Sequence, residues 1–421
     1  MHPNLSFEQA PPISVPYRFF LTTPCFGIAA GLLLLVEGET LLVSRWIPAT
    51  LAAVHLIVAG FMLQAMCGAL LQFIPVAAGG NIWRPRWLAA IVHPLLIVAT
   101  GLLVAAFLTH RPGLFVAAGH AFVVGLGIFI AVTVIALWQT PAQSATIIVL
   151  RTALVALLIT LVTGVALAMG LAKGLPWSLP ALTDVHAAWG LGGWALTLLA
   201  AVSFSVVPMF QLTPPYPQWF SRYFSWLLLG ALLLWSALFP QFSEPWRSIV
   251  LLAGLALAGG YGAMTLHLHA KRRRKVSDTS FLFFRVAMIS LLVLPLAASV
   301  ALTLDDGRIT VWLGVLVLFG VFFSVINGML YKIMPFINWL HLQRHYGMRS
   351  SPPTMNQMLA ESQMRGQFRV HLAALGLLLM AVWLPILARP AGLLLMLDCG
   401  WLALNLLRIV WTYRRIKARE I

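Results

Sequence analysis

The chain has 421 residues, of which 61% are apolar and only 9% are charged. Its mean hydropathy is +0.93. A soluble globular protein carries roughly 25% charged residues, so this composition excludes a water-soluble fold and indicates a polytopic membrane protein. The net charge of +16 does not indicate a nucleic-acid partner, because the basic residues follow a membrane topology.

Twelve apolar runs are each long enough to cross a bilayer, which takes about 20 helical residues. Only helices satisfy the backbone inside lipid in an open segment, so the predicted class is all-α. The predicted spans are 18–37, 49–76, 87–109, 114–138, 147–172, 184–209, 220–240, 247–269, 281–303, 309–337, 369–388 and 390–412. We expect one membrane domain over residues 1–421, with a cytoplasmic loop at 340–368 that contains a short interfacial helix.

The distribution of Lys and Arg predicts the orientation of these spans. With the N-terminus inside, all but six of the 27 basic residues fall on the inner side, including the KRRRK run at 271–275. We therefore expect both termini in the cytoplasm and the protein in a bacterial-type inner membrane, with the lipid bilayer as its first partner.

A threefold internal repeat is predicted from three matching segments. Spans 2, 6 and 10 each end in a short apolar stretch closed by a proline, at Pro75, Pro208 and Pro335, with a glycine fifteen residues before each. Small residues at a fixed register allow close helix packing in lipid. The chain is therefore expected to form three pseudo-symmetric four-helix arcs, at about 1–140, 141–270 and 271–421.

Four of the 11 histidines are predicted to lie within the bilayer. His93 precedes Pro94, so backbone groups freed by the proline can satisfy it. His55, His120 and His186 fall near the outer ends of spans 2, 4 and 6, and neutral imidazole is a common ligand of haem iron and of copper. His371 is placed at the inner interface, at the start of span 11.

Asp398 is the one acid expected inside a span, with Asn405 two turns further along. Ionisable residues within membrane helices mark ion or proton pathways or pair with a neighbouring helix. Both interpretations of Asp398 remain open from the sequence.

Three stretches together resemble the catalytic subunit (subunit I) of the haem–copper oxygen reductases, most closely the cbb3-type oxidases. HLIVAGFMLQAMCGALLQFIP at 55–75 is similar to the family's second helix, HAAWGLGGWALTLLAAVSFSVVP at 186–208 to its sixth, and GMLYKIMPF at 328–336 to the end of its tenth. The resemblance implies that His55 binds a low-spin haem and that His186 binds copper.

The chain departs from that family where further ligands are required. The tenth helix should supply two histidines, but Leu313 and Val315 stand at those positions, and span 7 has no copper-binding histidine. One histidine cannot define a copper site. We therefore expect no bound copper and no oxidase-type catalysis. The expected cofactor is one haem held by His55, with His120 or His186 as its partner.

Three functions follow as hypotheses. The first is a haem-binding electron carrier or O2/NO-responsive protein, with cytochrome c or respiratory oxidase subunits as partners. The second is a cofactor-free transporter in which Asp398 relays protons or cations. The third is an oxidase assembly factor.

Overall fold

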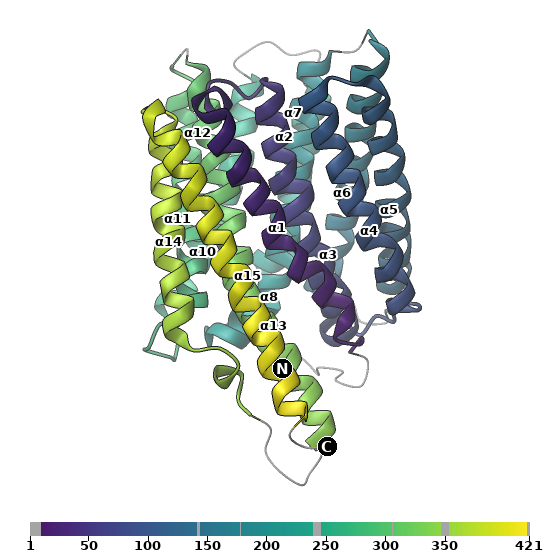
Figure 1. Ribbon diagram of the computed structural model, residues 1–421, viewed down its shortest axis with the longest axis vertical. Helices are drawn as coiled ribbons and strands as arrows, with labels where there is room; N and C mark the ends of the chain where they lie inside the picture. Colours follow the sequence, from purple (N-terminus) through teal and green to yellow (C-terminus); the bar gives the residue numbers. More distant parts are fainter. Residues whose placement is uncertain are drawn as a thin grey trace. The chain divides into compact units, whose positions relative to one another are not determined.

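The structure, a computed structural model, describes residues 10–140, 144–176, 178–238, 246–304, 306–346 and 353–418. Throughout these residues the regular secondary structure is helical, and no strand occurs among them. The prediction of an all-α polytopic membrane protein is confirmed (Figure 1).

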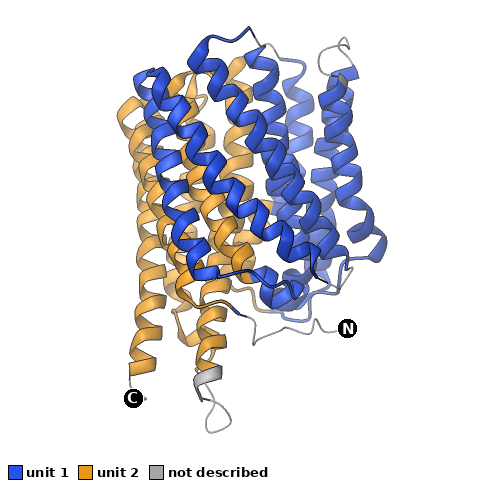
Figure 2. Cartoon of the chain, turned by 90° about the vertical axis from the view of Figure 1, so that its right-hand side faces the viewer, with its two compact units in different colours: residues 1–10, 73–275, 288–306 blue, residues 11–72, 276–287, 307–421 orange. Residues whose placement is uncertain are grey.

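The helices belong to two compact units, which are coloured separately in Figure 2. Unit 1 comprises residues 1–10, 73–275 and 288–306. Its helices are η4 (Ile74–Ala78), α4 (Pro85–Thr109), α5 (Pro112–Trp138), α6 (Ala145–Lys173), α7 (Leu179–Ala188), η5 (Trp189–Leu196), α8 (Thr197–Gln211), α9 (Gln218–Leu238) and α10 (Trp246–Ala270).

Unit 2 comprises residues 11–72, 276–287 and 307–421. Its helices are α1 (Ser14–Glu37), η2 (Gly38–Leu42), α2 (Pro48–His55), η3 (Leu56–Met62), α3 (Leu63–Phe73), α12 (Gly307–Val315), η6 (Leu316–Phe323), α13 (Ser324–Tyr346), η7 (Met355–Gln357), α14 (Glu361–Ala381), η8 (Pro385–Leu387) and α15 (Ala388–Ala418). Helix α11 (Thr279–Ala301) begins in unit 2 and continues into unit 1.

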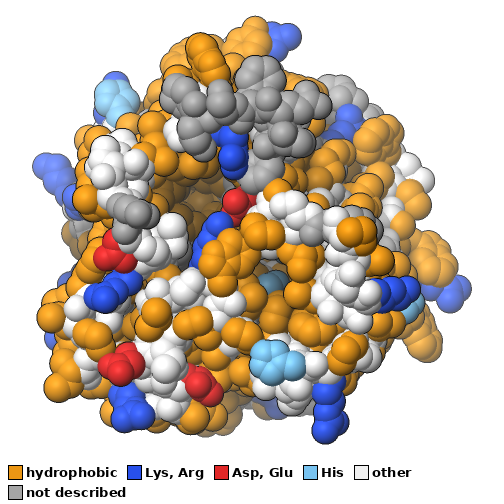
Figure 3. Space-filling view, turned by 90° about the horizontal axis from the view of Figure 1, so that it is seen from above, with side chains coloured by type: hydrophobic (Ala, Val, Ile, Leu, Met, Phe, Trp, Pro, Cys, Tyr) orange, Lys and Arg blue, Asp and Glu red, His pale blue; other side chains and the backbone are white. Residues whose placement is uncertain are grey.

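Eleven helical segments of the described chain are long and apolar enough to cross a membrane. The predicted span at 369–388 corresponds to α14, whose first half carries Arg365 and Arg369 and is less apolar than the others. Figure 3 shows hydrophobic side chains over much of the visible surface. Large apolar side chains such as Ile386 (84% exposed) and Leu296 (70%) are suited to lipid contact.

The loop predicted at 340–368 is shorter than expected. Helix α13 continues to Tyr346 and α14 begins at Glu361, because polar residues extend both helices beyond their apolar cores. Between them, Thr354 and Gln357 form a capping box on the one-turn helix η7. Residues 347–352 of this loop lie outside the described chain.

Three π-helical segments interrupt the helices that carry the repeat motifs. η3, η5 and η6 each begin nineteen residues before their proline, at Leu56, Trp189 and Leu316. A π-helical turn adds a residue to the helical turn and is often found at functional sites. The residues eleven before each proline are all polar and buried, namely Gln64, Thr197 and Ser324. The three motif segments therefore share a π-helical turn at the same distance from their prolines.

The hydroxyls at two of these positions bond to the π-helical backbone. Thr197 donates to the Gly192 carbonyl at 3.2 Å, and Ser324 donates to the Phe319 carbonyl at 3.0 Å, in each case five residues earlier. In a π-helical turn such carbonyls are displaced from the regular i→i−4 backbone hydrogen bonds, so a side-chain hydroxyl can bond to them.

Helices α1 and α15 pack in opposite directions along most of their length. Gly27 lies against Cys399, and Gly31 lies against Gly392. At the other end, Tyr17 donates to Asn338, which in turn donates to the Ile409 carbonyl at 3.2 Å. The start of α1 and the end of α15 therefore lie at the same end of unit 2.

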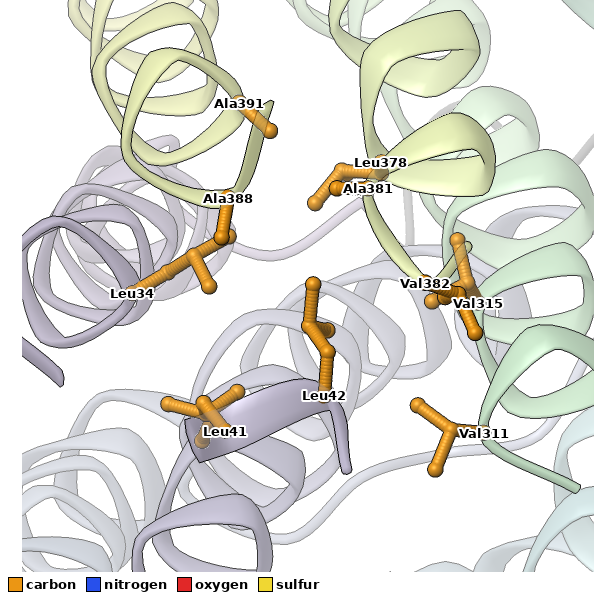
Figure 4. Packing of buried hydrophobic residues seen from close by; sticks show 11 residues of the cluster. Leu34, Leu41, Leu42, Val311, Val315, Leu378, Ala381, Val382, Ala388 and Ala391 are labelled. Carbon is orange, nitrogen blue, oxygen red and sulfur yellow. The ribbon is translucent and has the colours of Figure 1, made fainter. Parts of the chain in front are cut away.

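An aliphatic cluster holds the opposite end of unit 2 together (Figure 4). It joins side chains from α1, η2, α2, α12, α14 and α15, namely Leu34, Leu41, Leu42, Ala53, Val311, Val315, Leu378, Ala381, Val382, Ala388 and Ala391. Val315 is thus part of a packed apolar core at the position where the family resemblance requires a haem ligand.

The close approach of α1 and α15 generates a stability prediction. A Cβ atom on Gly392 would lie 2.7 Å from both the Gly31 carbonyl oxygen and the Leu35 nitrogen, which are backbone atoms that cannot rotate away. We expect Gly392→Ala to lower the free energy of unfolding by about 1–3 kcal/mol. The measurement is the thermal unfolding midpoint of the purified protein in detergent.

Gly400→Ala is the matched control, because it lies in the same helix and a Cβ there would meet nothing within 4 Å. Alanine favours helix over glycine by up to about 1 kcal/mol, so this variant should be neutral or more stable. Equal midpoints for the two variants would contradict the described packing.

Candidate functional site

A buried acid lies at the centre of the polar network in unit 2. Asp398, in the first half of α15, is fully buried. It lies where α15 packs against α14, and small residues on both helices allow this approach. A carboxylate deprived of water needs hydrogen-bond donors around it.

Two side chains of α14 supply those donors. His371 Nδ1 lies 2.9 Å from one carboxylate oxygen of Asp398, and the Gln367 side-chain amide donates to the other oxygen. Gln367 and His371 are four residues apart and therefore share one helical face. Both are buried, with exposed fractions of 0% and 2%. Each oxygen of the carboxylate thus has a partner.

The far nitrogen of the imidazole bonds to the third repeat's π-helical turn. His371 Nε2 lies 2.8 Å from Ser324 Oγ. Because the Ser324 hydroxyl hydrogen is directed at the Phe319 carbonyl, its oxygen accepts from Nε2–H. The order Asp398–His371–Ser324 resembles a catalytic triad, but Ser324 is fully buried and its hydrogen is already donated to the backbone.

On the other side, the network continues toward the surface of unit 2. The Tyr331 hydroxyl donates to Gln367 Oε1 at 3.3 Å and accepts from Asn405 Nδ2 at 2.8 Å. Arg408 then donates to Asn405 Oδ1 at 3.2 Å. Arg408 is exposed, whereas the other members are buried, so the network leads from the surface to the buried acid.

Aromatic rings enclose the imidazole. The Phe323 ring is parallel to that of His371, with centroids 5.9 Å apart, and the Phe283 ring lies 5.1 Å away. Phe323 also stacks on Phe61 at 3.8 Å. These rings exclude solvent, which strengthens the electrostatic interaction between Asp398 and His371.

The sequence analysis placed His371 at the membrane interface, at the start of span 11. The apolar run begins at 369, but α14 begins at Glu361, so His371 lies in the third turn of the helix. The sequence pattern that could have indicated its role is the four-residue spacing of Gln367 and His371, which places them on one helical face, together with the acid Asp398 in the following span.

Among the histidines predicted as haem ligands, His55 ends α2 and directly precedes the π-helical segment η3 in unit 2. Its Nδ1 donates to the Leu51 carbonyl at 2.7 Å. In a neutral ring this leaves the lone pair on Nε2, the arrangement usual for an imidazole that binds a metal.

His120 and His186 lie in unit 1, and each also has Nδ1 at a backbone carbonyl. His120 contacts the Val116 carbonyl at 2.8 Å, and His186 contacts the Thr160 carbonyl at 3.1 Å and the Thr163 hydroxyl at 3.2 Å. His120 is exposed and His186 is half-buried.

Helix α6 packs against α5 and α7 with opposite faces. Gly119 of α5 faces Val165 and Met169, whereas His186 of α7 faces Gly164 and the turn before it. At about 100° per residue, these contacts lie on opposite sides of α6. The helices that carry His120 and His186 therefore do not share a face of α6.

His93 is half-buried in α4 and directly precedes Pro94. Within the described residues, no group of three or more His, Cys, Asp or Glu side chains is arranged to hold a metal ion.

The bridging position of Tyr331 generates a prediction for the network. Tyr331→Phe removes one hydroxyl but leaves Asn405 and Gln367 buried with a bond lost from each. We expect the free energy of unfolding to fall by about 1–3 kcal/mol, measured as a lower thermal midpoint. Tyr223→Phe, at a tyrosine that is 52% exposed, is the control and should leave the midpoint unchanged. Equal midpoints would show that the Tyr331 hydroxyl bridges nothing.

No protein-family model matches this chain, and no curated protein is detectably similar to it. The fold establishes a multi-pass helical membrane protein.

Proposed function

We propose that this protein is a proton-coupled membrane transporter in which Asp398 and His371 hold the proton. The observation that supports it is the fully buried carboxylate, whose two oxygens accept from an imidazole and a carboxamide. Ionisable groups placed inside a membrane protein at the expense of solvation are typical of proton relays.

The pair is neutral overall when His371 is protonated and Asp398 is ionised. In that state Nδ1–H donates to Asp398 and Nε2–H donates to Ser324, so every polar hydrogen has an acceptor. Adding or removing one proton leaves a net charge among buried aromatic rings, which is costly in a low-dielectric environment. Proton binding therefore favours a rearrangement that exposes the pair or compensates its charge, and this couples protonation to conformation.

The direction of access follows from the network. From Asp398 to Arg408 is ten residues of α15, or about 15 Å along the helix axis. The polar groups between them, Tyr331 and Asn405, extend from Asp398 toward one end of unit 2. This is the end at which α1 begins and α15 ends. By the charge distribution this end is cytoplasmic, so the proton would exchange with the cytoplasm.

Asp398→Asn tests this function. An asparagine can still accept from Gln367 and can donate to His371 Nδ1, so the fold should be retained while the acid is lost. In proteoliposomes that contain a pH-sensitive dye, we expect wild-type protein to conduct protons down an imposed pH gradient. We expect the variant to do so at least about tenfold more slowly, because the neutral amide binds no proton at these pH values.

His55→Ala is the control and should leave proton flux unchanged. Proton flux by the Asp398→Asn variant at the wild-type rate would refute the proposal, as would wild-type flux no greater than that of protein-free liposomes. Thermal midpoints of both variants separate a loss of function from a loss of folding.

A second candidate function is haem binding, on the observation that His55, His120 and His186 each fix Nδ1 at a backbone carbonyl. This orientation presents Nε2 to an iron and suits axial ligation. A bound haem would supply one-electron or gas-binding chemistry, in keeping with the oxidase resemblance. His55 holds its tautomer through Leu51, and so is the first ligand to test.

The absorption spectrum tests this candidate. Protein purified from haem-replete cells should show a Soret band, and His55→Ala should shift or abolish it because an axial nitrogen is lost. His93→Ala removes a histidine without an assigned ligand role and should leave the band unchanged. A colourless wild-type preparation would refute haem binding.

A further inference from the structure

Two side-chain amides in unit 2 are fully buried without a protein hydrogen-bond partner among the described residues. Gln64 in α3 and Asn327 in α13 both have an exposed fraction of 0%. Neither the nitrogen nor the oxygen of either amide is bonded. Gln72 of α3, which is 5% exposed, is likewise unbonded at both amide atoms. Buried side-chain polar groups are bonded in the large majority of cases, so these exceptions in one unit require an explanation.

The helices that carry these amides run in the same direction. Along α1, Phe19 contacts Gly68 and Phe26 contacts Gly60, so α3 is antiparallel to α1. Likewise, Tyr17 bonds to Asn338 and Gly27 contacts Phe323, so α13 is antiparallel to α1. The segments that contain Gln64 and Asn327 are therefore parallel to each other.

The stacked rings of Phe61 and Phe323 fix the register between these two helices. Gln64 follows Phe61 by three residues, so its direction about the helix axis is about 60° short of a full turn from that of Phe61. Asn327 follows Phe323 by four residues, so its direction is about 40° past a full turn from that of Phe323. On facing parallel helices these opposite deviations point to the same side. The two amides therefore lie one turn beyond the stacked rings, on one side of the contact.

A third polar group is found on α1 at the same level. By the contacts above, the residues of α1 beside Gln64 and Asn327 are those around Thr23 and Pro24. Pro24 is buried inside α1 and has no amide hydrogen to donate to the Phe20 carbonyl four residues earlier. The Phe20 carbonyl therefore lacks its regular helical donor.

This set of groups selects the chemistry of a ligand. A cation would satisfy the oxygens but leave both NH2 groups without an acceptor, and an anion would do the reverse. An uncharged molecule that both donates and accepts hydrogen bonds satisfies all of them. Leaving the amides unbonded would be unfavourable inside the protein, so occupancy by such a molecule is favoured.

We propose that Gln64 and Asn327 form a binding site for a small uncharged molecule that both donates and accepts hydrogen bonds, such as water or a simple amide. That the molecule is the transported substrate rests on the proposed transport function. The site itself depends only on the two unpartnered amides and their common placement.

Solute exchange by the reconstituted full-length protein tests the site. In acetamide-loaded proteoliposomes we expect wild-type protein to exchange labelled acetamide faster than protein-free liposomes. Gln64→Leu combined with Asn327→Leu should slow this exchange by about tenfold or more, since the hydrogen bonds to the ligand are lost. Osmotic water permeability, measured by light scattering, is the second measurement. If the double variant lowers water permeability but not acetamide exchange, the ligand is water.

Sodium and formate are the charged probes and should not be exchanged. Exchange of either at the acetamide rate would overturn the proposal, and so would acetamide and water rates that are equal in the wild type and the double variant. Tyr223→Phe, at an exposed tyrosine outside both sites, is the control and should leave acetamide exchange intact. Proton flux and acetamide exchange are measured separately for each variant. Loss of proton flux with intact exchange, or the reverse, therefore tells the two proposals apart.

A matched pair of glutamines tests the unpartnered state directly. Gln64 and Gln367 are both fully buried in unit 2, but Gln367 bonds to Asp398 and Tyr331. Gln64→Leu should leave the thermal midpoint unchanged or raise it, because leucine is uncharged, of similar size and breaks no protein bond. Gln367→Leu should lower it by several degrees. A similar fall for both variants would mean that Gln64 has a protein partner, and would overturn the site.

Discussion

The hydrogen bonds to the Asp398 carboxylate determine how the helices of unit 2 can be arranged. Within lipid no water can satisfy this group, so donors must come from neighbouring helices. Gln367 and His371 meet that need from α14, and their own remaining atoms bond in turn to Tyr331 and Ser324 of α13. One buried acid thereby fixes the register of three helices.

The same constraint explains why the π-helical turn in the third repeat carries Ser324. The extra residue of a π turn displaces the Phe319 carbonyl, and the Ser324 hydroxyl bonds to it while accepting from His371. At the equivalent positions in the described chain, Thr197 bonds only to the Gly192 carbonyl of its own helix, and Gln64 has no protein partner. Three related positions therefore carry three different polar environments.

Much of the fold could be predicted from sequence, because hydropathy and the Lys and Arg distribution report directly on lipid contact. The acid Asp398 was also predictable, since charge is rare in apolar spans. His371 was not, because Arg365 and Arg369 nearby make its segment resemble an interface. Gln64 and Asn327 gave no signal, since an uncharged amide does not interrupt hydropathy, and only packing reveals whether it is bonded.

Unit 2 is assembled from the two extremes of the chain, with α1 lying along α15. During synthesis α1 must therefore remain in the membrane without this partner until α15 has been inserted, whereas α4, α5 and α6 can associate as soon as they emerge. The face of α1 that carries Gly31 lacks its partner throughout this interval. The contact between α1 and α15 closes only after α15 is inserted, and a chain without α15 would leave α1 exposed to lipid and to quality-control proteases.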